Sequence, residues 1–523
     1  MENYTFKSKM ILSLISIFFI VFNLFSRDIH ISKSGDNNNP GTRNLPYLTI
    51  QKGINEALEG DIVLIAPGIY NEDIKSVNSG AEGKFITVKS RDAQNFAIVR
   101  GSFSSFKKSY LRIENIRFEN ARNGIYIEGP CNNIEIIGNQ TFNTLSSGIG
   151  IWGVAWRKDP LIYENISNVV IRNNIVENAC NGGFNECITL ANGITDFEIS
   201  NNEIFGGRDG SNGGEGIDIK EGAKRGKIYN NKIHDLKRQA GIYLDAGGLL
   251  GFDPPEIKDI EIYNNIVWDN VNAGAGGGAY TMGTEGDGST FDILLVNNIA
   301  HNTGEDGFMI YKHPAGSGNI YNIKAINNTF VNNGRFGMLL NFSSAENIVY
   351  RNNICFGNSW ENFKLSDYSS FEASNNLTDG TDPKFVDKDN ADFKLRPDSP
   401  AIDAGTFQDS WDRDIENLPR FGAIDIGAHE YQKDALSIND FTFDSNKFRT
   451  KIFPNPIKSG NILKIESSIR RMRFRITDMK GALIRENKAI DQIQLDISPG
   501  LYIISFYDPL KNAKINEHKL IIY

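Results

Sequence analysis

Residues 213–235 read GGEGIDIKEGAKRGKIYNNKIHD, and both halves of this stretch recur along the chain. The second half, IYNNKI, belongs to a series of Asn-Asn pairs flanked by aliphatic residues. The first Asn of each pair stands at position 173, 201, 230, 264, 297, 327, 352 or 375, so neighbouring pairs are 23 to 34 residues apart. Periods in this range are typical of solenoid proteins.

The first half, GIDIKE, belongs to a second series that alternates with the Asn pairs. Its members are GIYIEG, GIGIWG, CITLAN, GIDIKE, GIYLDA, GAYTMG, GFMIYK and GMLLNF. Alternating apolar and polar residues indicate short strands, and Asn or Gly between them suits tight corners. The sequence therefore predicts an all-β fold, a right-handed parallel β-helix in which neighbouring coils lie about 4.8 Å apart. We expect the Asn pairs to form a hydrogen-bonded ladder at one corner.

The segments on either side of the repeats predict how the solenoid begins and ends. An amphipathic helix near 49–58 is expected to cover the first coil, because open solenoid ends need capping. From about Lys447 the pattern changes to that of a small β-sandwich. We expect a signal peptide at 1–26, the cap and first coils at 27–120, the β-helix at 121–382, a closing segment and linker at 383–440, and a C-terminal domain at 447–523.

Composition excludes some functions and indicates a compartment. The net charge of −9 without a basic stripe argues against nucleic acid as a partner. Four cysteines are too few for a disulfide scaffold, so we expect buried thiols, with a Cys180–Cys187 pair left open. Two lysines followed by the apolar run 10–26 indicate a secretory signal; a retained membrane anchor is the alternative.

Polar residues gather at the outward positions of the second series in the middle coils. Side chains alternate along a strand, so residues two and four after the glycine should face solvent. This places one group within about 10 Å: Glu186, Glu215, Asp218, Lys220, Tyr243 and Asp245. We expect Trp152, Tyr280 and Tyr311 to flank it as platforms for sugar rings.

Two interpretations of this charged group remain open. Exposed strands carry charges for solubility, and a Lys220–Asp245 salt pair would contribute little. Alternatively the group is a site, in which the repulsion among Glu186, Glu215 and Asp218 is relieved by calcium or by a raised carboxyl pKa.

The start of the chain, ISKSGDNNNPGTRNLPYLTIQKGINEALEGDIVLIAPGIYNE, and the GGEGID segment resemble family 9 polysaccharide lyases of the pectin-lyase-like superfamily. In that family, acids of a D-D-G-x-x-D-like segment and an acid of the preceding coil hold calcium. Glu215 and Asp218 match two of these acids and Glu186 could be the acid of the preceding coil, but Gly214 replaces the third. The resemblance implies a lysine base on the following coil, where this chain has Tyr243; the available Lys220 lies on the calcium coil itself.

The last 75 or so residues contain KIFPNP, RFRITDMKGALI, LDISPGLYIISF and the terminal KLIIY. These motifs resemble the C-terminal sorting domain of type IX secretion in Bacteroidetes. The resemblance implies export to the cell surface or the medium through the type IX machinery.

Three classes of function are compatible with these features. The first is a calcium-assisted lyase that cleaves a uronate-containing glycan by β-elimination, with Lys220, Tyr243 and Asp245 as catalytic residues. The second is an inverting glycoside hydrolase, with Asp218 and Asp245 about 8 Å apart. The third is a non-catalytic glycan-binding surface protein. We expect a monomer, and we expect neither His301 nor His313 to be catalytic, since their spacing suits no metal.

Overall fold

The computed structural model describes the chain in fifteen segments. They are 26–153, 166–183, 185–207, 213–237, 240–247, 255–271, 278–312, 317–341, 344–365, 371–432, 450–467, 472–479, 482–489, 492–507 and 514–523. Contacts divide the chain after Tyr431 into a β-helix unit and a C-terminal unit, which are described separately. The expected signal peptide lies outside the described residues, apart from Ser26. Among the described residues, no helix has the length and apolar character needed to cross a membrane.

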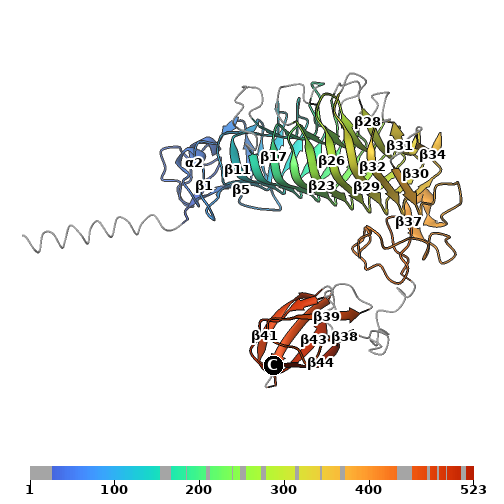
Figure 1. Cartoon of the computed structure of the whole chain (residues 1–523). Helices are drawn as coiled ribbons and strands as arrows, with labels where there is room; N and C mark the ends of the chain where they lie inside the picture. Colours follow the sequence, from blue (N-terminus) through green and yellow to red (C-terminus); the bar gives the residue numbers. More distant parts are fainter. Residues whose placement is uncertain are drawn as a thin grey trace, which may run out of the picture. The chain divides into compact units, whose positions relative to one another are not determined.

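The β-helix unit consists of three parallel sheets that run along one axis (Figure 1), which confirms the predicted right-handed parallel β-helix. Sheet A contains β1 (Asp28–Ile31), β2 (Ile62–Ile65), β5 (Ile86–Ser90), β8 (Leu111–Glu114), β11 (Cys131–Ile137), β14 (Ile166–Arg172), β17 (Ile194–Ser200), β20 (Lys224–Tyr229), β23 (Ile257–Tyr263), β26 (Thr290–Val296), β29 (Ile320–Ile326), β32 (Glu346–Arg351) and β35 (Phe371–Ser374). Sheet B contains β3 (Gly68–Tyr70), β6 (Ala97–Val99), β9 (Ile116–Glu119), β12 (Gln140–Phe142), β15 (Ile175–Glu177), β18 (Glu203–Phe205), β21 (Lys232–His234), β24 (Ile266–Trp268), β27 (Ile299–His301), β30 (Thr329–Val331) and β33 (Ile354–Phe356). Sheet C contains β4 (Ile74–Lys75), β7 (Phe103–Phe106), β10 (Ile125–Glu128), β13 (Ile149–Trp152), β16 (Ile188–Ala191), β19 (Ile217–Lys220), β22 (Ile242–Asp245), β25 (Tyr280–Thr284), β28 (Phe308–Lys312), β31 (Phe336–Asn341) and β34 (Glu361–Leu365).

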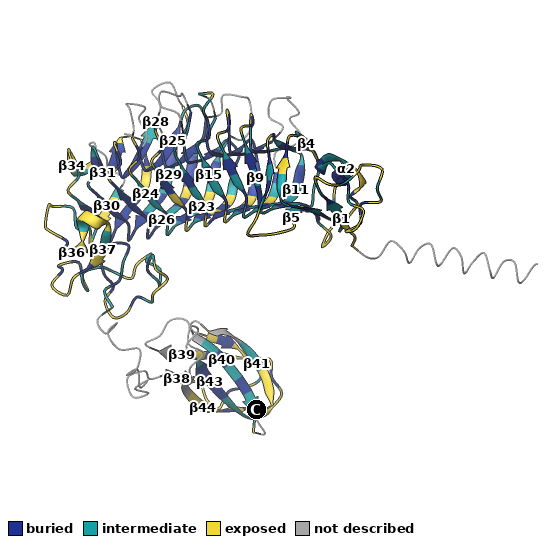
Figure 2. Cartoon of the chain, turned by 180° about the vertical axis from the view of Figure 1, so that it is seen from behind, coloured by how far each residue is buried: buried dark blue, intermediate teal, exposed yellow. Residues whose placement is uncertain are grey.

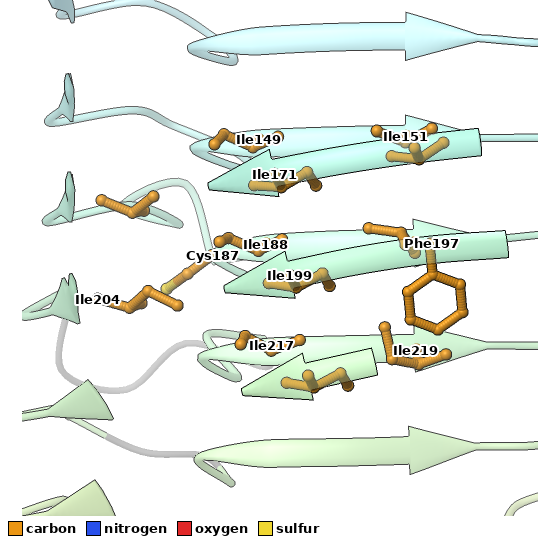
Figure 3. Packing of buried hydrophobic residues seen from close by; sticks show 14 of the residues in the cluster. Ile149, Ile151, Ile171, Cys187, Ile188, Phe197, Ile199, Ile204, Ile217 and Ile219 are labelled. Carbon is orange, nitrogen blue, oxygen red and sulfur yellow. The ribbon is translucent and has the colours of Figure 1, made fainter. Parts of the chain in front are cut away.

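Inward aliphatic residues stack from coil to coil and form one continuous core. Figure 3 shows Ile149, Ile188 and Ile217 one above another in sheet C, with Ile171 and Ile199 of sheet A facing them. All five side chains are fully buried, as Figure 2 indicates for the inner residues of the strands in general. Because the core is continuous, each coil fixes the height and register of the next.

The predicted cap is present as α2 (Ile50–Glu56), which packs on the first strands of the unit. The Thr49 hydroxyl accepts a hydrogen bond from the Lys52 N–H and so caps the helix N-terminus. Ile50, Gly53 and Ile54 are buried, and a Cβ on Gly53 would lie only 2.4 Å from Cδ1 of Ile31. The glycine therefore allows the helix to sit directly on the open end of the core.

The two residues of each Asn pair have different tasks. The first Asn takes a left-handed backbone conformation, as at Asn230, where φ is 56°. The second is buried, and its carboxamide joins a ladder that runs from coil to coil. In this ladder Asn231 Nδ2 donates to Ile199 O and to Asn265 Oδ1, both at 2.9 Å, while Asn231 Oδ1 accepts from the backbone and side chain of Asn202.

Loss of one ladder carboxamide should be costly. An Asn231→Ala variant leaves the buried Asn202 N–H without its acceptor and removes one donor each from Ile199 O and Asn265 Oδ1, so we expect the free energy of unfolding to fall by about 2–4 kcal/mol. Urea unfolding of the full chain measures this. The control is Asn230→Gly, which keeps an allowed backbone at an exposed position and should change stability by less than about 1 kcal/mol; equal losses in both variants would contradict a stabilising ladder.

The closing segment folds back onto sheet B and the Asn corner. It includes β36 (Phe385–Asp387), the 3-10 helix η2 (Lys388–Asn390) and β37 (Asp392–Leu395). Phe385 and Phe393 pack against Ile299, Val331 and Ile354 in a second apolar cluster. The segment thus belongs to the β-helix unit.

The C-terminal unit contains two antiparallel sheets with a core of their own. One has β38 (Thr450–Phe453), β39 (Ile462–Ser467) and β42 (Gln492–Gln494); the other has β40 (Met472–Asp478), β41 (Leu483–Ala489), β43 (Gly500–Tyr507) and β44 (Lys514–Ile522). This agrees with the predicted small β-sandwich.

Candidate functional site

The site is built on three neighbouring strands of sheet C, namely β16, β19 and β22. Thr189 pairs with Asp218 and Asp218 with Tyr243, while Lys220 pairs with Asp245. Since these positions alternate with buried aliphatic residues, their side chains all project from the outer face of the sheet. The expected alignment of GIDIKE with GIYLDA is therefore the observed register.

The Lys220 ammonium lies at the centre of the site. Its Nζ is 2.9 Å from Asp218 Oδ2, 3.3 Å from Asp245 Oδ2 and 3.4 Å from Glu186 Oε1. The lysine side chain is 19% exposed and its three partners are more deeply buried. This arrangement differs from an exposed cross-strand salt pair, because one cation is shared by three carboxylates that have lost most of their water.

Glu186, Glu215 and Asp218 form an oxygen-rich cluster beside the ammonium. One carboxylate oxygen from each lies within 4.8 Å of those of the other two. Thr189 Oγ1 orients Glu186 by donating to its Oε2 at 2.8 Å. Glu215 Oε2 and Asp218 Oδ1 are buried and accept no hydrogen bond from any group among the described residues.

Burial and mutual repulsion raise the pKa values of Glu215, Asp218 and Asp245. Burial, reinforced by Glu186, raises the pKa of Glu215 to about 8. Burial raises the pKa of Asp245 to about 7. Burial, reinforced by Glu186, Glu215 and Asp245, raises the pKa of Asp218 well above its ordinary value. Burial alone would lower the pKa of Lys220, but the surrounding carboxylates outweigh it and raise that pKa. The ammonium therefore keeps its proton at neutral pH.

Tyr243 lies beside the cluster and has a partner that the repeats do not reveal. Its hydroxyl donates to Glu285 Oε1 at 3.0 Å, and its ring lies over Gly283, where a Cβ would be only 2.7 Å from Tyr243 Cε2. Burial and the nearby carboxylates of Asp245 and Glu285 raise the pKa of Tyr243. Glu285 follows β25 in the loop TEGDGST. In the sequence, the length of this loop is the only feature that indicates a residue beside the site.

The three aromatic residues predicted to flank the site differ in where their side chains lie. Trp152 ends β13, in the column that continues through Ala191 toward Lys220, and is half-buried. Tyr311 pairs with Gly283 on the preceding coil and is also half-buried. The expectation for Tyr280 is wrong: its side chain is fully buried, pairs with Ile242 and donates to Asn265 O at 2.8 Å.

The Tyr280 error has a simple cause. Three small residues, Gly277, Gly278 and Ala279, stand in a row before Tyr280. If Gly278 is aligned with the glycines of the other repeats, Tyr280 is predicted to face outward. In the structure Tyr280 pairs with Ile242, so Ala279 is the residue that matches Gly241. A shift by one residue turns every side chain to the other face of a strand. The outward residues of β25 are therefore Thr281 and Gly283.

One of the two histidines considered from the sequence lies in a different sheet from the site. His301 ends β27 in sheet B, where it stacks on Trp268 and burial lowers its pKa to about 4. His313 lies outside the described residues. The four cysteines are free and buried, as expected.

Comparisons with known proteins agree with this architecture. Residues 105–291 match the family model described as "Right handed beta helix region". Residues 451–523 match "Secretion system C-terminal sorting domain", and 33–78 match a model described as a protein of unknown function. The sorting domain directs type IX secretion, so the protein is exported to the cell surface or the extracellular space.

Similar chains extend over most of the sequence. "Uncharacterized protein YwoF" of Bacillus subtilis (strain 168) is 24% identical over 451 residues, which cover 71% of this chain and 92% of that protein. A complex of XylC with xylose has a TM-score of 0.53 at 14% identity, covering 78% of this chain and 98% of XylC. Pectate lyase Pel9A has a TM-score of 0.51 at 17% identity, covering 78% and 97%. At these identities the two structural likenesses establish the fold alone.

Proposed function

We propose that this exported protein acts on a polysaccharide and cleaves a uronate-containing glycan by calcium-assisted β-elimination. The observation that carries the proposal is the buried cluster in which Lys220 is shared by Asp218, Asp245 and Glu186 while Glu215 stands alongside. Titratable groups that are strongly perturbed by one another are typical of active sites. The similarity to pectate lyase Pel9A supports a glycan as the substrate class.

The cluster fits a calcium ion. Oxygens bound to one calcium at about 2.3–2.6 Å lie within about 5 Å of one another, and the oxygens of Glu186, Glu215 and Asp218 meet this condition. Lys220 holds Asp218 Oδ2, whereas Asp218 Oδ1 and Glu215 Oε2 have no hydrogen-bond donor among the described residues. When the four acids are ionised, a single ammonium does not balance their charge, so a dication is favoured there once the pH exceeds the raised pKa values of Glu215, Asp218 and Asp245. When bound, calcium would neutralise the substrate carboxylate and so make its α-proton more acidic.

The contacts of Lys220 favour a division of roles that differs from the one expected from the sequence. Because its three carboxylate partners raise the pKa of Lys220, this residue keeps its proton and serves as a fixed positive charge. Asp245, with a pKa of about 7 and an Oδ1 that accepts no hydrogen bond from the described residues, is the better proton acceptor. Asp245 takes the C5 proton, the C4–O bond breaks as the C4–C5 double bond forms, and Tyr243 donates its hydroxyl proton to the leaving oxygen. In the free protein this proton lies in the hydrogen bond to Glu285 Oε1, so the Tyr243 hydroxyl turns from Glu285 to the leaving oxygen in this step.

The geometry disfavours an inverting hydrolase that uses Asp218 and Asp245. Since Lys220 Nζ is 2.9 Å from Asp218 Oδ2 and 3.3 Å from Asp245 Oδ2, these oxygens lie closer together than the lower limit of about 6.5 Å for such pairs. The ammonium also occupies the space in which an attacking water would stand.

The test is a panel of polyuronates and neutral glycans incubated with the full chain, with and without a chelator. Elimination produces an unsaturated uronate that absorbs in the near ultraviolet, and we expect this absorbance from a polyuronate and its loss on chelation. New reducing ends without absorbance would indicate a hydrolase, and binding without cleavage would indicate a surface adhesin; either result rejects the proposal.

The raised carboxyl pKa values predict how stability depends on pH. In the folded protein Asp245 and Glu215 have pKa values of about 7 and about 8, so they keep their protons up to neutral pH. In the unfolded chain the same groups lose these protons near pH 4. Stability of the metal-free protein should therefore be highest at acidic pH and fall as pH rises to about 8. Calcium should restore it at pH 8, because the ion binds the folded state. Calorimetric melting at pH 5 and pH 8 tests this, with Glu215→Gln expected to show a smaller fall. A melting temperature that responds to neither pH nor calcium would contradict the assignment.

A further inference from the structure

A second candidate site lies on the other side of the β-helix, between the Asn corner and the closing segment. There the surface is hollowed into an open cavity of about 540 Å³. Its walls come from the Asn corner and sheet B at one side and from the closing segment at the other. The charged group around Lys220, the sheet C centre, does not contribute to it. The volume is in the usual range for small-molecule sites, about 300–1,000 Å³.

The Asn corner behaves differently in its two halves. In the C-terminal half, the first Asn of each pair binds the closing segment: Asn297 Nδ2 donates to Arg413 O at 2.7 Å, Asn352 Nδ2 to Thr406 O at 2.8 Å and Asn375 Nδ2 to Ala404 O at 3.0 Å. Asn327 likewise donates to Asp425 O at 2.9 Å. This column of carboxamides is therefore a recognition surface within the fold.

In the middle coils, carboxamides of the same column line the cavity and make no hydrogen bond to the closing segment. Asn201, Asn230 and Asn264 take the same left-handed backbone, with φ of 55° to 56°, and project from successive coils. Their side chains make no hydrogen bond to any of the described residues. Asn264 Oδ1 is buried nonetheless, and across the cavity so is Nδ1 of His429, which also finds no partner in the described part of the chain. Buried polar atoms without partners are rare and indicate a bound water or ligand.

The remaining lining indicates the kind of ligand. Ile266, Ile299 and Phe393 form an apolar floor. The charges of the lining are balanced, because Lys394 pairs with Glu416 at 2.8 Å and the lining holds one further lysine, Lys232, and one further acid, Asp392. Carboxamides both donate and accept hydrogen bonds, so they match hydroxyl groups better than a carboxylate, which only accepts.

We infer that this cavity is a binding site for a neutral saccharide of one or two rings, separate from the catalytic centre. Pyranose rings combine an apolar face, which suits the isoleucine floor, with hydroxyls at the edge, which suit three carboxamides about 4.8 Å apart. A short peptide is the competing ligand, since the other Asn residues of the column bind peptide carbonyls. The apolar floor and the balanced charges of the lining favour the sugar. The inference holds whether or not the sheet C centre is a lyase.

Calorimetric titration of the full chain with glucose, galactose, cellobiose, maltose and lactose tests this site. We expect one of them to bind, and both Asn230→Gly and Asn264→Gly to weaken that binding at least about tenfold, the effect of losing one good hydrogen bond. The matched control is Asn173→Gly, in the same column with φ of 59° but outside the cavity, which should bind as the wild type does. All three variants should retain wild-type glycan cleavage.

Three outcomes would overturn the inference. They are no heat of binding with any of the five sugars, equal weakening in Asn173→Gly, and a tetra-alanine peptide that binds in their place and is lost in Asn264→Gly. Because cleavage is measured on the same proteins, failure of this site and failure of the sheet C centre are distinguished.

Discussion

An Asp218→Asn variant should form the unsaturated product at least about 100-fold more slowly than the wild type and yet be no less stable. The expected loss of activity follows from the position of Asp218, which contacts the Lys220 ammonium and offers a second oxygen to the proposed calcium. Stability should be kept or increased because the substitution removes one negative charge from a buried group of four acids. Initial rates of near-ultraviolet absorbance and urea unfolding of the same sample measure both effects.

The control for this variant is Asp196→Asn, which removes a carboxylate at an exposed ion pair with Arg225 in sheet A. Its activity should equal that of the wild type. If Asp218→Asn retains full activity, the centre on β19 is not where the chemistry occurs. If it loses activity only because it unfolds, Asp218 has a structural task instead.

Replacing Lys220 by Met should destabilise the β-helix unit by about 3–5 kcal/mol at neutral pH, since it leaves buried carboxylates without their cation. The penalty should shrink at pH 5, where the acids take up protons, and it should shrink again in a Lys220→Met, Asp218→Asn double variant. Urea unfolding of the two single variants and the double variant at both pH values gives the coupling between the two residues.

The matched control is Lys227→Met, which removes a lysine from an exposed pair with Glu261 in sheet A. Exposed pairs of this kind contribute less than about 1 kcal/mol. A Lys220→Met protein as stable as this control, at pH 7 and pH 5 alike, would show that the ammonium does not neutralise the cluster. The role of Lys220 as a fixed positive charge would then be wrong.

The fold is predictable because the repeats specify it twice. Each Asn pair places one residue in the left-handed turn and one in the buried ladder, so the pairs mark the coil length directly. The alternation in GIDIKE then separates inward from outward residues. These two signals are sufficient to place Asp218, Lys220 and Asp245 together on one face of the solenoid.

What the sequence does not predict depends on side chains from outside the repeats or on choices among similar residues. Tyr280 is misplaced by the repeat pattern because three small residues in a row can each form the corner. The repeat pattern does not predict the role of Glu285, because this residue comes from a loop rather than from a repeat strand. The protonation of Lys220, and with it the choice between a base and a fixed charge, depends on carboxylates supplied by β19, by β22 and by Glu186 just before β16.

Mass spectrometry of the reaction products in ¹⁸O-labelled water tests the central claim most directly. In β-elimination the chain is cleaved without addition of water, so the new non-reducing end is one water lighter than a saturated sugar. We predict such unsaturated fragments from a polyuronate in the presence of calcium. Saturated fragments with one ¹⁸O per cleaved bond, after correction for exchange at the reducing end, would show hydrolysis and contradict the proposed chemistry.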